Sequence, residues 1–172
     1  MNSMHKINKQ TLDEFISIFG NIFEHSEWIM ESTYNQKPFK DFEDLRSKMI
    51  CIFESTSEEV QLKILNSHPN LVNKAKVANL LSSNSKYEQM KAGLDHCSKD
   101  EFNEFKRLNK KYKEKFGFPF ILAVKNKNRS EILSIFKKRI LYDVSVEFNE
   151  AKIQVQKIAN LRLDELIEKY EE

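Results

Sequence analysis

Glycine and proline are scarce in this chain, and their scarcity narrows the folds open to it more than any other feature. Only three glycines and three prolines occur among 172 residues, whereas sheets joined by tight turns use these residues at most connections. Apolar residues recur instead at steps of three and four, the spacing of one helix face. The sequence therefore predicts an all-α fold, a single-domain bundle of about eight or nine helices over residues 1–172.

The composition favours a globular protein without membrane or nucleic-acid partners. Apolar residues make up 40% of the chain and charged residues 31%, enough for one core and a solvated exterior. The net charge of +2 gives no strong field toward phosphate backbones or anionic lipid. No apolar run approaches the roughly 20 residues of a membrane span, and the first residues lack an apolar signal segment. We therefore expect a cytoplasmic protein.

Sequence motifs that bind metals or cofactors are absent. Cys51 and Cys97 are isolated, without the CxxC spacing of a zinc cluster, and their expected role is that of small apolar groups. The patterns HExxH, GxGxxG and GxxxxGK do not occur. Any chemistry must then use ordinary side chains, and we expect no cofactor.

Capping patterns help to place the helices. Thr11 followed by Glu14 fits a capping box at the start of a first helix. Ser85 followed by Glu88 fits the same pattern, so the expected role of this pair is structural. Helices are predicted at about residues 11–23, shortly after 26, and at about 41–54, 57–66, 98–117, 130–141 and 144–170.

Besides the Ser85 to Glu88 segment, three places do not fit a plain helical bundle: His68, the apolar stretch around Pro119, and Arg162. His68 precedes Pro69, and because proline disfavours helical backbone in the residue before it, His68 should stand at a helix exit. There it either complements the helix dipole or moves protons. The apolar run from Phe118 to Val124 is expected to be a buried extended segment. Its amides need partners, either from the core or from a polar ligand.

Arg162 lies on the apolar stripe of the last predicted helix. It is four residues from both Ile158 and Leu166, so its side chain should point inward. A buried guanidinium is costly unless it meets a carboxylate or another anion. Arg162 should therefore have an acidic partner inside the protein or an anionic ligand, and the sequence leaves both alternatives open.

Several short segments occur together in a fixed order along nearly the whole chain. They are Glu24 to Trp28, His68 to Leu71, Ser85 to Gln89, Ala92 to Asp95, Leu108 with Asn109, Phe116 to Ile121, and Ile158 to Leu163. This ordered set resembles the 2-oxo-4-hydroxy-4-carboxy-5-ureidoimidazoline (OHCU) decarboxylase family. The order of the segments is far more specific than any one of them.

The resemblance implies an all-helical carboxy-lyase, usually a homodimer, that uses no cofactor. Such an enzyme forms (S)-allantoin and carbon dioxide from the ureidoimidazoline that follows urate oxidation and ring opening. The resemblance further implies that His68 is catalytic, with Glu88 as its acidic neighbour and Arg162 as an anion-binding group. The implied substrate pocket consists of Pro69, Ser85, Lys86, Tyr87, Glu88, Gln89, Phe120, Ile121, Leu122, Ala123 and Val124.

The chain departs from the family pattern at a few positions. Asn70 stands where the family usually has aspartate, Val72-Asn73 where it often has a glycine, and Glu27 where it has proline. The three catalytic positions are intact. Three alternatives to the enzyme remain. The first is a catalytically inactive helical ligand-binding or interaction module of the same fold, and the second is a scaffold in which Arg162 is only structural. The third is a nucleic-acid binder that uses the basic face of the helix at about 98–117.

Overall fold

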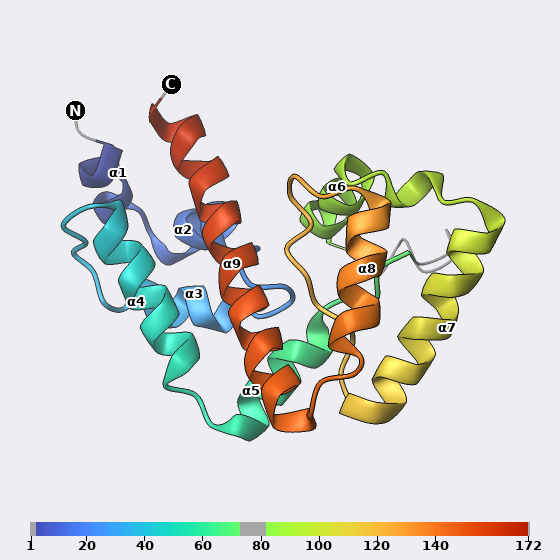
Figure 1. Cartoon of the computed structure of the whole chain (residues 1–172). Coiled ribbons are helices and arrows are strands. Elements are labelled where there is room, and N and C mark those ends of the chain that lie inside the picture. The colour runs from blue at the N-terminus through green and yellow to red at the C-terminus, as the bar shows by residue number, and fades with distance from the viewer. Residues whose placement is uncertain (1–2, 73–81, 172) are drawn as a thin grey trace. The chain divides into compact units, whose positions relative to one another are not determined.

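The computed structural model describes residues 3–72 and 82–171, and helices form all the regular structure in this part of the chain (Figure 1). The described residues contain nine α-helices and one short 3₁₀ helix, which confirms the all-α prediction. They are α1 (Ser3–Lys9), α2 (Leu12–Phe19), α3 (Glu27–Tyr34), α4 (Phe42–Glu54), α5 (Glu58–Ser67), α6 (Ser83–Lys91), η2 (Leu94–His96), α7 (Lys99–Phe116), α8 (Arg129–Arg139) and α9 (Val144–Glu171).

The start of α2 is predicted correctly, but its end is not. Thr11 and Glu14 form the expected reciprocal capping box. The helix stops at Phe19 rather than at about Phe23, and Gly20 follows it. Beyond this point the carbonyl oxygen of Asn21 accepts a hydrogen bond from the guanidinium of Arg162 (3.2 Å). A side chain distant in sequence therefore satisfies a main-chain carbonyl that lies beyond the end of the helix.

The chain divides into two compact units, Met1–Ile64 with Gln156–Glu172, and Leu65–Val155. Helices α5 and α9 contribute residues to both units. The prediction of a single domain over 1–172 stays a prediction, and each unit is described below by itself.

Aromatic side chains of α2 form the centre of the first unit. The ring centroids of Phe15 and Phe19 are 4.7 Å apart, and Phe15 also packs on Phe39 at 6.0 Å. Phe19 stacks on Tyr170 near the end of α9, at 6.2 Å. The Ser3 hydroxyl donates to the main-chain carbonyl of Tyr170 (3.2 Å), so the two ends of the described chain lie side by side (Figure 1).

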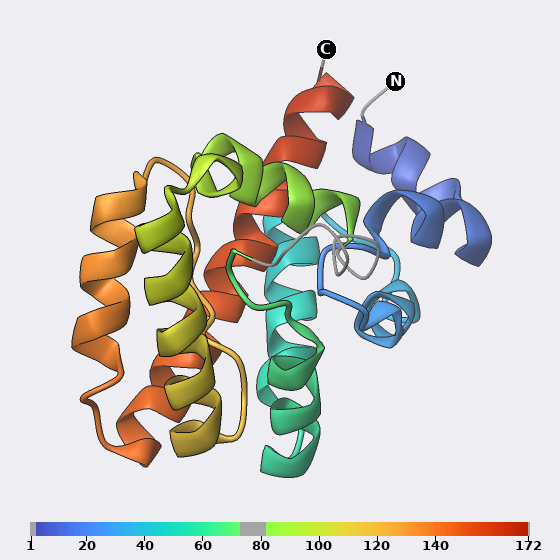
Figure 2. The ribbon, with the colours of Figure 1, turned by 90° about the vertical axis from the view of Figure 1, so that its right-hand side faces the viewer.

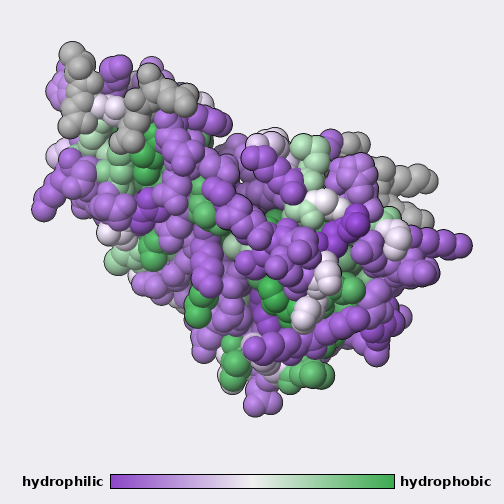
Figure 3. All heavy atoms as spheres, turned by 45° about the horizontal axis from the view of Figure 1, so that its top comes forward, coloured by the Kyte–Doolittle hydropathy of each residue, from purple (hydrophilic) through white to green (hydrophobic). Residues whose placement is uncertain are grey.

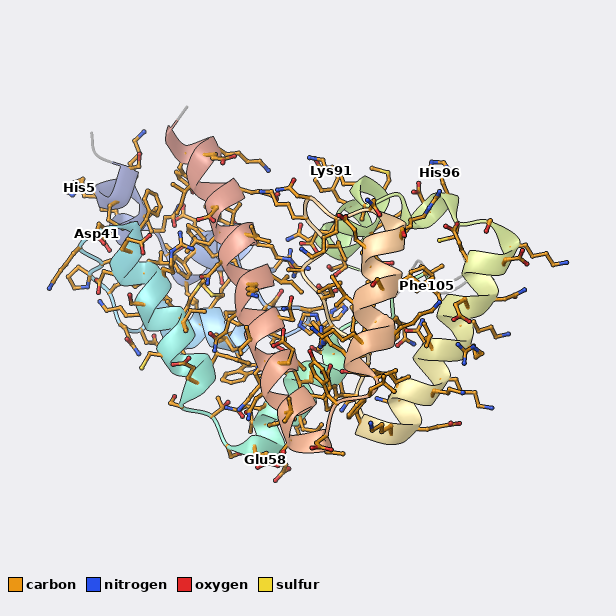
Figure 4. All side chains as sticks on the ribbon, viewed as in Figure 1. His5, Asp41, Glu58, Lys91, His96 and Phe105 are labelled. Atoms are coloured by element: carbon orange, nitrogen blue, oxygen red, sulfur yellow. The ribbon has the colours of Figure 1, made fainter. Side chains whose placement is uncertain are left out.

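Tyr112 of α7 lies at the centre of the second unit. Its ring centroid is 4.5 Å from that of Phe116, 5.4 Å from Phe120 and 5.6 Å from Phe136. Phe120 and Phe136 stack with centroids 3.9 Å apart. Helices α7 and α8 run side by side in Figures 1 and 2, and Phe105, labelled in Figure 4, packs from α7 on Phe136 at 6.4 Å. This cluster holds the coil between α7 and α8 against both helices.

Hydrophilic residues cover most of the face shown in Figure 3, with apolar residues exposed only in small areas. Within residues 3–72 and 82–171, no helix combines the length and the apolar character that crossing a membrane requires.

Candidate functional site

His68 stands at the exit of α5, as the sequence predicted. The helix ends at Ser67, and the His68 N–H donates to the carbonyl oxygen of Leu65 (3.2 Å). Pro69 follows and cannot donate to the helical ladder. His68 is buried, with 7% of its surface exposed. The imidazole is therefore shielded from bulk solvent at the start of an irregular loop.

Two side-chain amides hold the loop that follows His68. The Gln89 carbonyl oxygen accepts the N–H of Val72 (3.1 Å), and the Gln89 amide nitrogen donates to the main-chain carbonyl of Asn70 (3.4 Å). The Asn109 amide nitrogen donates to the main-chain carbonyl oxygen of Leu71 (2.8 Å). The Gln89 side chain, predicted to bind substrate, thus binds the backbone of the His68 loop.

Val72 occupies a strained conformation within this loop. Its φ of 57° lies in the left-handed region, which a β-branched residue rarely adopts. Such strain persists only where surrounding contacts impose it, and the hydrogen bonds from Gln89 and Asn109 are such contacts. The adjoining Asn73, which completes the predicted departure from the family pattern, lies outside the described residues.

The predicted capping box at Ser85 is wrong. Ser82 precedes α6, and its hydroxyl accepts the Ser85 N–H (3.1 Å). Ser85 therefore lies inside the first turn of the helix, where it is buried. The residue before the helix is the one that can accept from its unpaired N–H groups, and the Ser82-x-x-Ser85 spacing meets that need one turn earlier than predicted.

The predicted site residues of α6 divide between two faces of the helix. Ser85 is buried, and Glu88 and Gln89, three and four residues later, are partly buried on the same side. Lys86 and Tyr87 are exposed, and the structure does not bring them to that face. Because Gln89 contacts the His68 loop, the turn that carries Glu88 also lies beside this loop.

The segment from Phe118 to Val124 is non-helical and buried, as predicted. Two polar side chains bind its backbone. Arg139 donates to the Ile121 carbonyl oxygen (2.7 Å), and Gln154 accepts the Ala123 N–H (3.0 Å). The Ala123 N–H, predicted to contact substrate, thus donates its hydrogen bond to the Gln154 side chain. No residue in the described part of the chain accepts a hydrogen bond from the Ile121 or Leu122 N–H.

Arg162 points into the core of the first unit and meets a carboxylate there. Its Nη1 lies 3.0 Å from Oε2 of Glu24, and the two side chains are 3% and 0% exposed. The same nitrogen donates to the carbonyl oxygens of Asn21 (3.2 Å) and Ile22 (3.4 Å). The predicted acidic partner of Arg162 therefore exists. His68 and Glu88 belong to the second unit, and Arg162 belongs to the first.

The two cysteines differ in their surroundings. Cys51 is exposed. Burial raises the pKa of the Cys97 thiol, and the nearby Glu101 carboxylate adds to the effect, so Cys97 is a poor nucleophile at neutral pH. Across the described residues, no three side chains of His, Cys, Asp or Glu come together as metal ligands.

Four residues that contact the predicted site, or pair with it, had no predicted role: Glu24, Asn109, Arg139 and Gln154. Glu24 and Asn109 lie inside segments that carry the family resemblance, but neither was assigned a function there. Arg139 follows the buried Phe136 by three residues, and Gln154 follows the buried Ala151 by three. This spacing places both on buried helix faces and is the signal that could have identified them.

We predict that Gln89→Leu lowers the free energy of unfolding by about 1–3 kcal/mol, because it leaves two main-chain groups of the His68 loop unpaired. Urea denaturation measures the loss. Gln36→Leu is the matched control, since Gln36 is exposed and its change should stay within about 0.5 kcal/mol. Equal stability of the two variants would show that the loop does not need Gln89.

We predict that Glu24→Gln destabilises the protein by about 3–5 kcal/mol, because it leaves the buried Arg162 charge uncompensated. The combined change Glu24→Gln with Arg162→Met removes both charges and should recover much of that loss. Thermal and urea denaturation of Glu24→Gln, Arg162→Met and the combined variant tests the coupling. If the combined variant is as unstable as the sum of its single changes, the ion pair is not what stabilises this region.

A profile of the OHCU decarboxylase family matches residues 8–164. The 2-oxo-4-hydroxy-4-carboxy-5-ureidoimidazoline decarboxylase of Haloferax volcanii is 37% identical over 163 residues, which make up 95% of this chain and 95% of that protein. The uric acid degradation bifunctional protein of Bacillus sp. (strain TB-90) is 38% identical over 166 residues, 96% of this chain but only 32% of that protein.

The fold also has a solved counterpart. A crystal structure of (S)-allantoin synthase matches with a TM-score of 0.76 and 26% identity, covering 95% of this chain and 53% of that one. In sequence, the chain spans about a third of the length of the bifunctional relative and nearly all of the Haloferax volcanii relative. With the family profile extending over almost all of its length, the chain belongs to the OHCU decarboxylase family.

Proposed function

We propose that this chain is a carboxy-lyase that converts OHCU into (S)-allantoin in urate degradation and needs no cofactor. The observation that carries the proposal is the family match over residues 8–164, which includes every predicted site position. The Haloferax volcanii relative, named for this activity, matches 95% of both chains. The small-molecule substrate is therefore a ureidoimidazoline.

The reaction breaks the bond between the ring carbon and its carboxylate. Carbon dioxide leaves, and the electron pair of that bond passes into the ring, where the imine acts as the sink. The imine nitrogen takes up a proton as it receives the pair, which leaves an enol. The enol hydroxyl then loses its proton while the neighbouring ring carbon gains one, so that one proton is consumed overall. The protein has to bind the anion, exclude water and move these protons.

His68 is the group proposed to move protons. An unperturbed imidazole has a pKa of about 6.5, which suits both proton removal and proton delivery near neutral pH. His68 is buried at the start of a loop that Gln89 and Asn109 hold. Glu88, on the adjacent turn of α6, is proposed to orient the imidazole and favour its protonated form. The face of the ring carbon that His68 protonates then decides the enantiomer.

Arg162 is proposed to bind the substrate carboxylate or the developing oxyanion through its planar guanidinium. Its ion pair with Glu24 orients the guanidinium and compensates its charge. Pro69, the α6 residues from Ser85 to Gln89 and the main-chain groups of the segment Phe120 to Val124 are proposed to line the rest of the substrate pocket. The Ala123 N–H is the exception in this segment, because it donates to Gln154 instead.

The resemblance to the family also supports a proposal for the assembly and location of the chain. We propose a homodimer in the cytoplasm, without nucleic-acid or membrane partners. Light scattering of the purified protein coupled to size-exclusion chromatography measures its assembly state directly.

The activity is tested by generating the unstable substrate in the cuvette, through enzymatic oxidation of urate and hydrolytic ring opening. Formation of allantoin is then followed by circular dichroism. Acceleration of the decarboxylation with a single-handed product supports the proposal. A folded protein that leaves the spontaneous rate and the racemic product unchanged would instead be an inactive binding module of the same fold.

We predict that His68→Asn lowers kcat by roughly 100- to 10,000-fold, the usual contribution of a general acid–base group. The stability should change little, since the residue lies at a helix exit and asparagine fills most of the space. Circular dichroism measures both the rate and the fold. Near-normal turnover in the folded variant would mean that another residue moves the protons.

We predict that Arg162→Lys folds but loses about 10- to 100-fold in kcat/KM. Lysine keeps a positive charge beside Glu24 but lacks the fork that binds a carboxylate at two points, and one charge-assisted hydrogen bond contributes about 1.5–3 kcal/mol. Full activity in this variant would assign Arg162 a purely structural role.

A further inference from the structure

A buried arginine holds the middle of the segment Phe118 to Val124. Nη1 of Arg139 donates to the carbonyl oxygen of Ile121 (2.7 Å), and the guanidinium carbon lies 4.5 Å from the ring centroid of Phe120. Arg139 is only 3% exposed. One side chain therefore holds both a carbonyl group and an aromatic ring of the same short segment.

Arg139 is itself held in one orientation. Its Nε lies 3.0 Å and its Nη2 2.5 Å from Oε1 of Glu147, whose side chain is fully buried. The Tyr112 hydroxyl donates to the same carboxylate. Burial and this carboxylate raise the pKa of Tyr112, so the hydroxyl keeps its proton and remains a donor. A guanidinium that is bound along one edge can present its remaining nitrogen in only one direction.

A second side chain binds the same segment two residues further on. The Gln154 oxygen accepts the Ala123 N–H (3.0 Å), and the Gln154 amide nitrogen donates to Glu150 Oε1 (2.8 Å). Gln154 is 5% exposed. The hydrogen bond to Glu150 fixes which end of the Gln154 amide faces the segment.

The two contacts lie on either side of Leu122. A peptide unit is planar and trans, so its C=O and N–H point in opposite directions. Holding the Ile121 oxygen therefore directs the Leu122 N–H away from Arg139, and holding the Ala123 N–H directs the Leu122 carbonyl away from Gln154. Leu122 is buried, and among the described residues neither its N–H nor its C=O has a hydrogen-bond partner.

We propose that Arg139 and Gln154 are positioning residues that fix the main-chain N–H and C=O of Leu122 in the directions needed to bind substrate. This inference rests on the proposed function, in which the segment lines the substrate pocket. A ureido or ring amide group offers one carbonyl acceptor and one N–H donor, the complement of what Leu122 presents. Prior orientation of these groups removes an ordering cost from binding.

The test compares the steady-state kinetics of the wild type with those of four variants. Gln154→Leu removes the acceptor for the Ala123 N–H, and KM is expected to rise about tenfold with kcat within about twofold, because the lost interaction serves binding in the ground state and the transition state alike. Gln156→Leu is the matched control. Gln156 and its hydrogen-bond partner Glu54 both belong to the first unit, whereas the segment Phe118 to Val124 belongs to the second, so the KM of this variant should equal that of the wild type.

The third variant exchanges the two polar groups. Gln154→Glu combined with Glu150→Gln keeps an acceptor for the Ala123 N–H and a hydrogen bond between the two side chains. It should restore the wild-type KM, which a loss of packing alone would not predict. Amide hydrogen exchange of the peptide covering residues 118–124, expected to be faster only in Gln154→Leu, reports on the segment without using catalysis.

Arg139→Lys extends the test to the other contact. Lysine keeps the charge beside Glu147 but cannot bind that carboxylate along one edge while donating to Ile121, so KM is again expected to rise. Should Gln154→Leu fail to fold, Gln154→Met carries the same expectation.

The outcomes separate the two proposals. An inactive wild type overturns the proposed function, and with it this inference. An active wild type whose folded Gln154→Leu and Arg139→Lys variants keep their KM overturns the inference alone. A raised KM that the exchange variant does not restore also contradicts it, because the effect would then come from packing.

Discussion

The described part of this chain contains two buried arginines, each compensated by a buried glutamate. Arg162 meets Glu24 at 3.0 Å, and Arg139 meets Glu147 at 2.5 Å. A charge in a helical core is costly without such a partner. Both guanidinium groups also donate to main-chain carbonyls outside the helices, Arg162 to Asn21 and Arg139 to Ile121. The paired charges thus determine where non-helical backbone can lie within each unit.

This constraint matters because an α-helix uses its own main-chain groups internally. In an all-helical protein, peptide groups can bind a ligand only where the helical ladder stops. Helical hydrogen bonding is interrupted at a few buried places, including the loop after His68 and the segment Phe118 to Val124. Each is held by side chains of neighbouring elements, by Gln89 and Asn109 in the first case and by Arg139 and Gln154 in the second. His68, Pro69 and the predicted site residues from Phe120 to Val124 lie at these places, whereas those from Ser85 to Gln89 lie on α6 and Arg162 lies on α9.

Much of the fold could be predicted from the sequence, because helical periodicity and capping are local properties. The Thr11 capping box and the helix exit at His68 depend on residues a few positions apart, and both predictions are confirmed. The inward direction of Arg162 follows from the spacing of the apolar stripe in the same way. Its partner Glu24 could not be identified, because nothing local links two residues from opposite ends of the chain.

The incorrect predictions have the same physical origin. The first helix was predicted too long because its periodicity continues past Gly20, while the main-chain groups beyond it pair with Arg162. The α6 cap was placed at Ser85 because a glutamate follows at the right spacing, yet Ser82 offers the hydroxyl that the helix start uses. Arg139 was overlooked because it follows two lysines in a last helical turn, where basic residues usually face solvent and complement the dipole.

Stability alone does not account for the polar groups around Tyr112. Replacing a buried ion pair by apolar side chains of similar size is often neutral or stabilising, and the aromatic rings around Tyr112 already supply a packed core. An apolar side chain in place of Arg139 would fill the same space, but it could not hold the Ile121 carbonyl in one direction. A site without a cofactor that binds substrate through peptide groups needs those groups oriented before the substrate arrives. The polar core of the second unit is therefore better explained by the geometry it imposes on the segment around Leu122 than by the free energy it adds to folding.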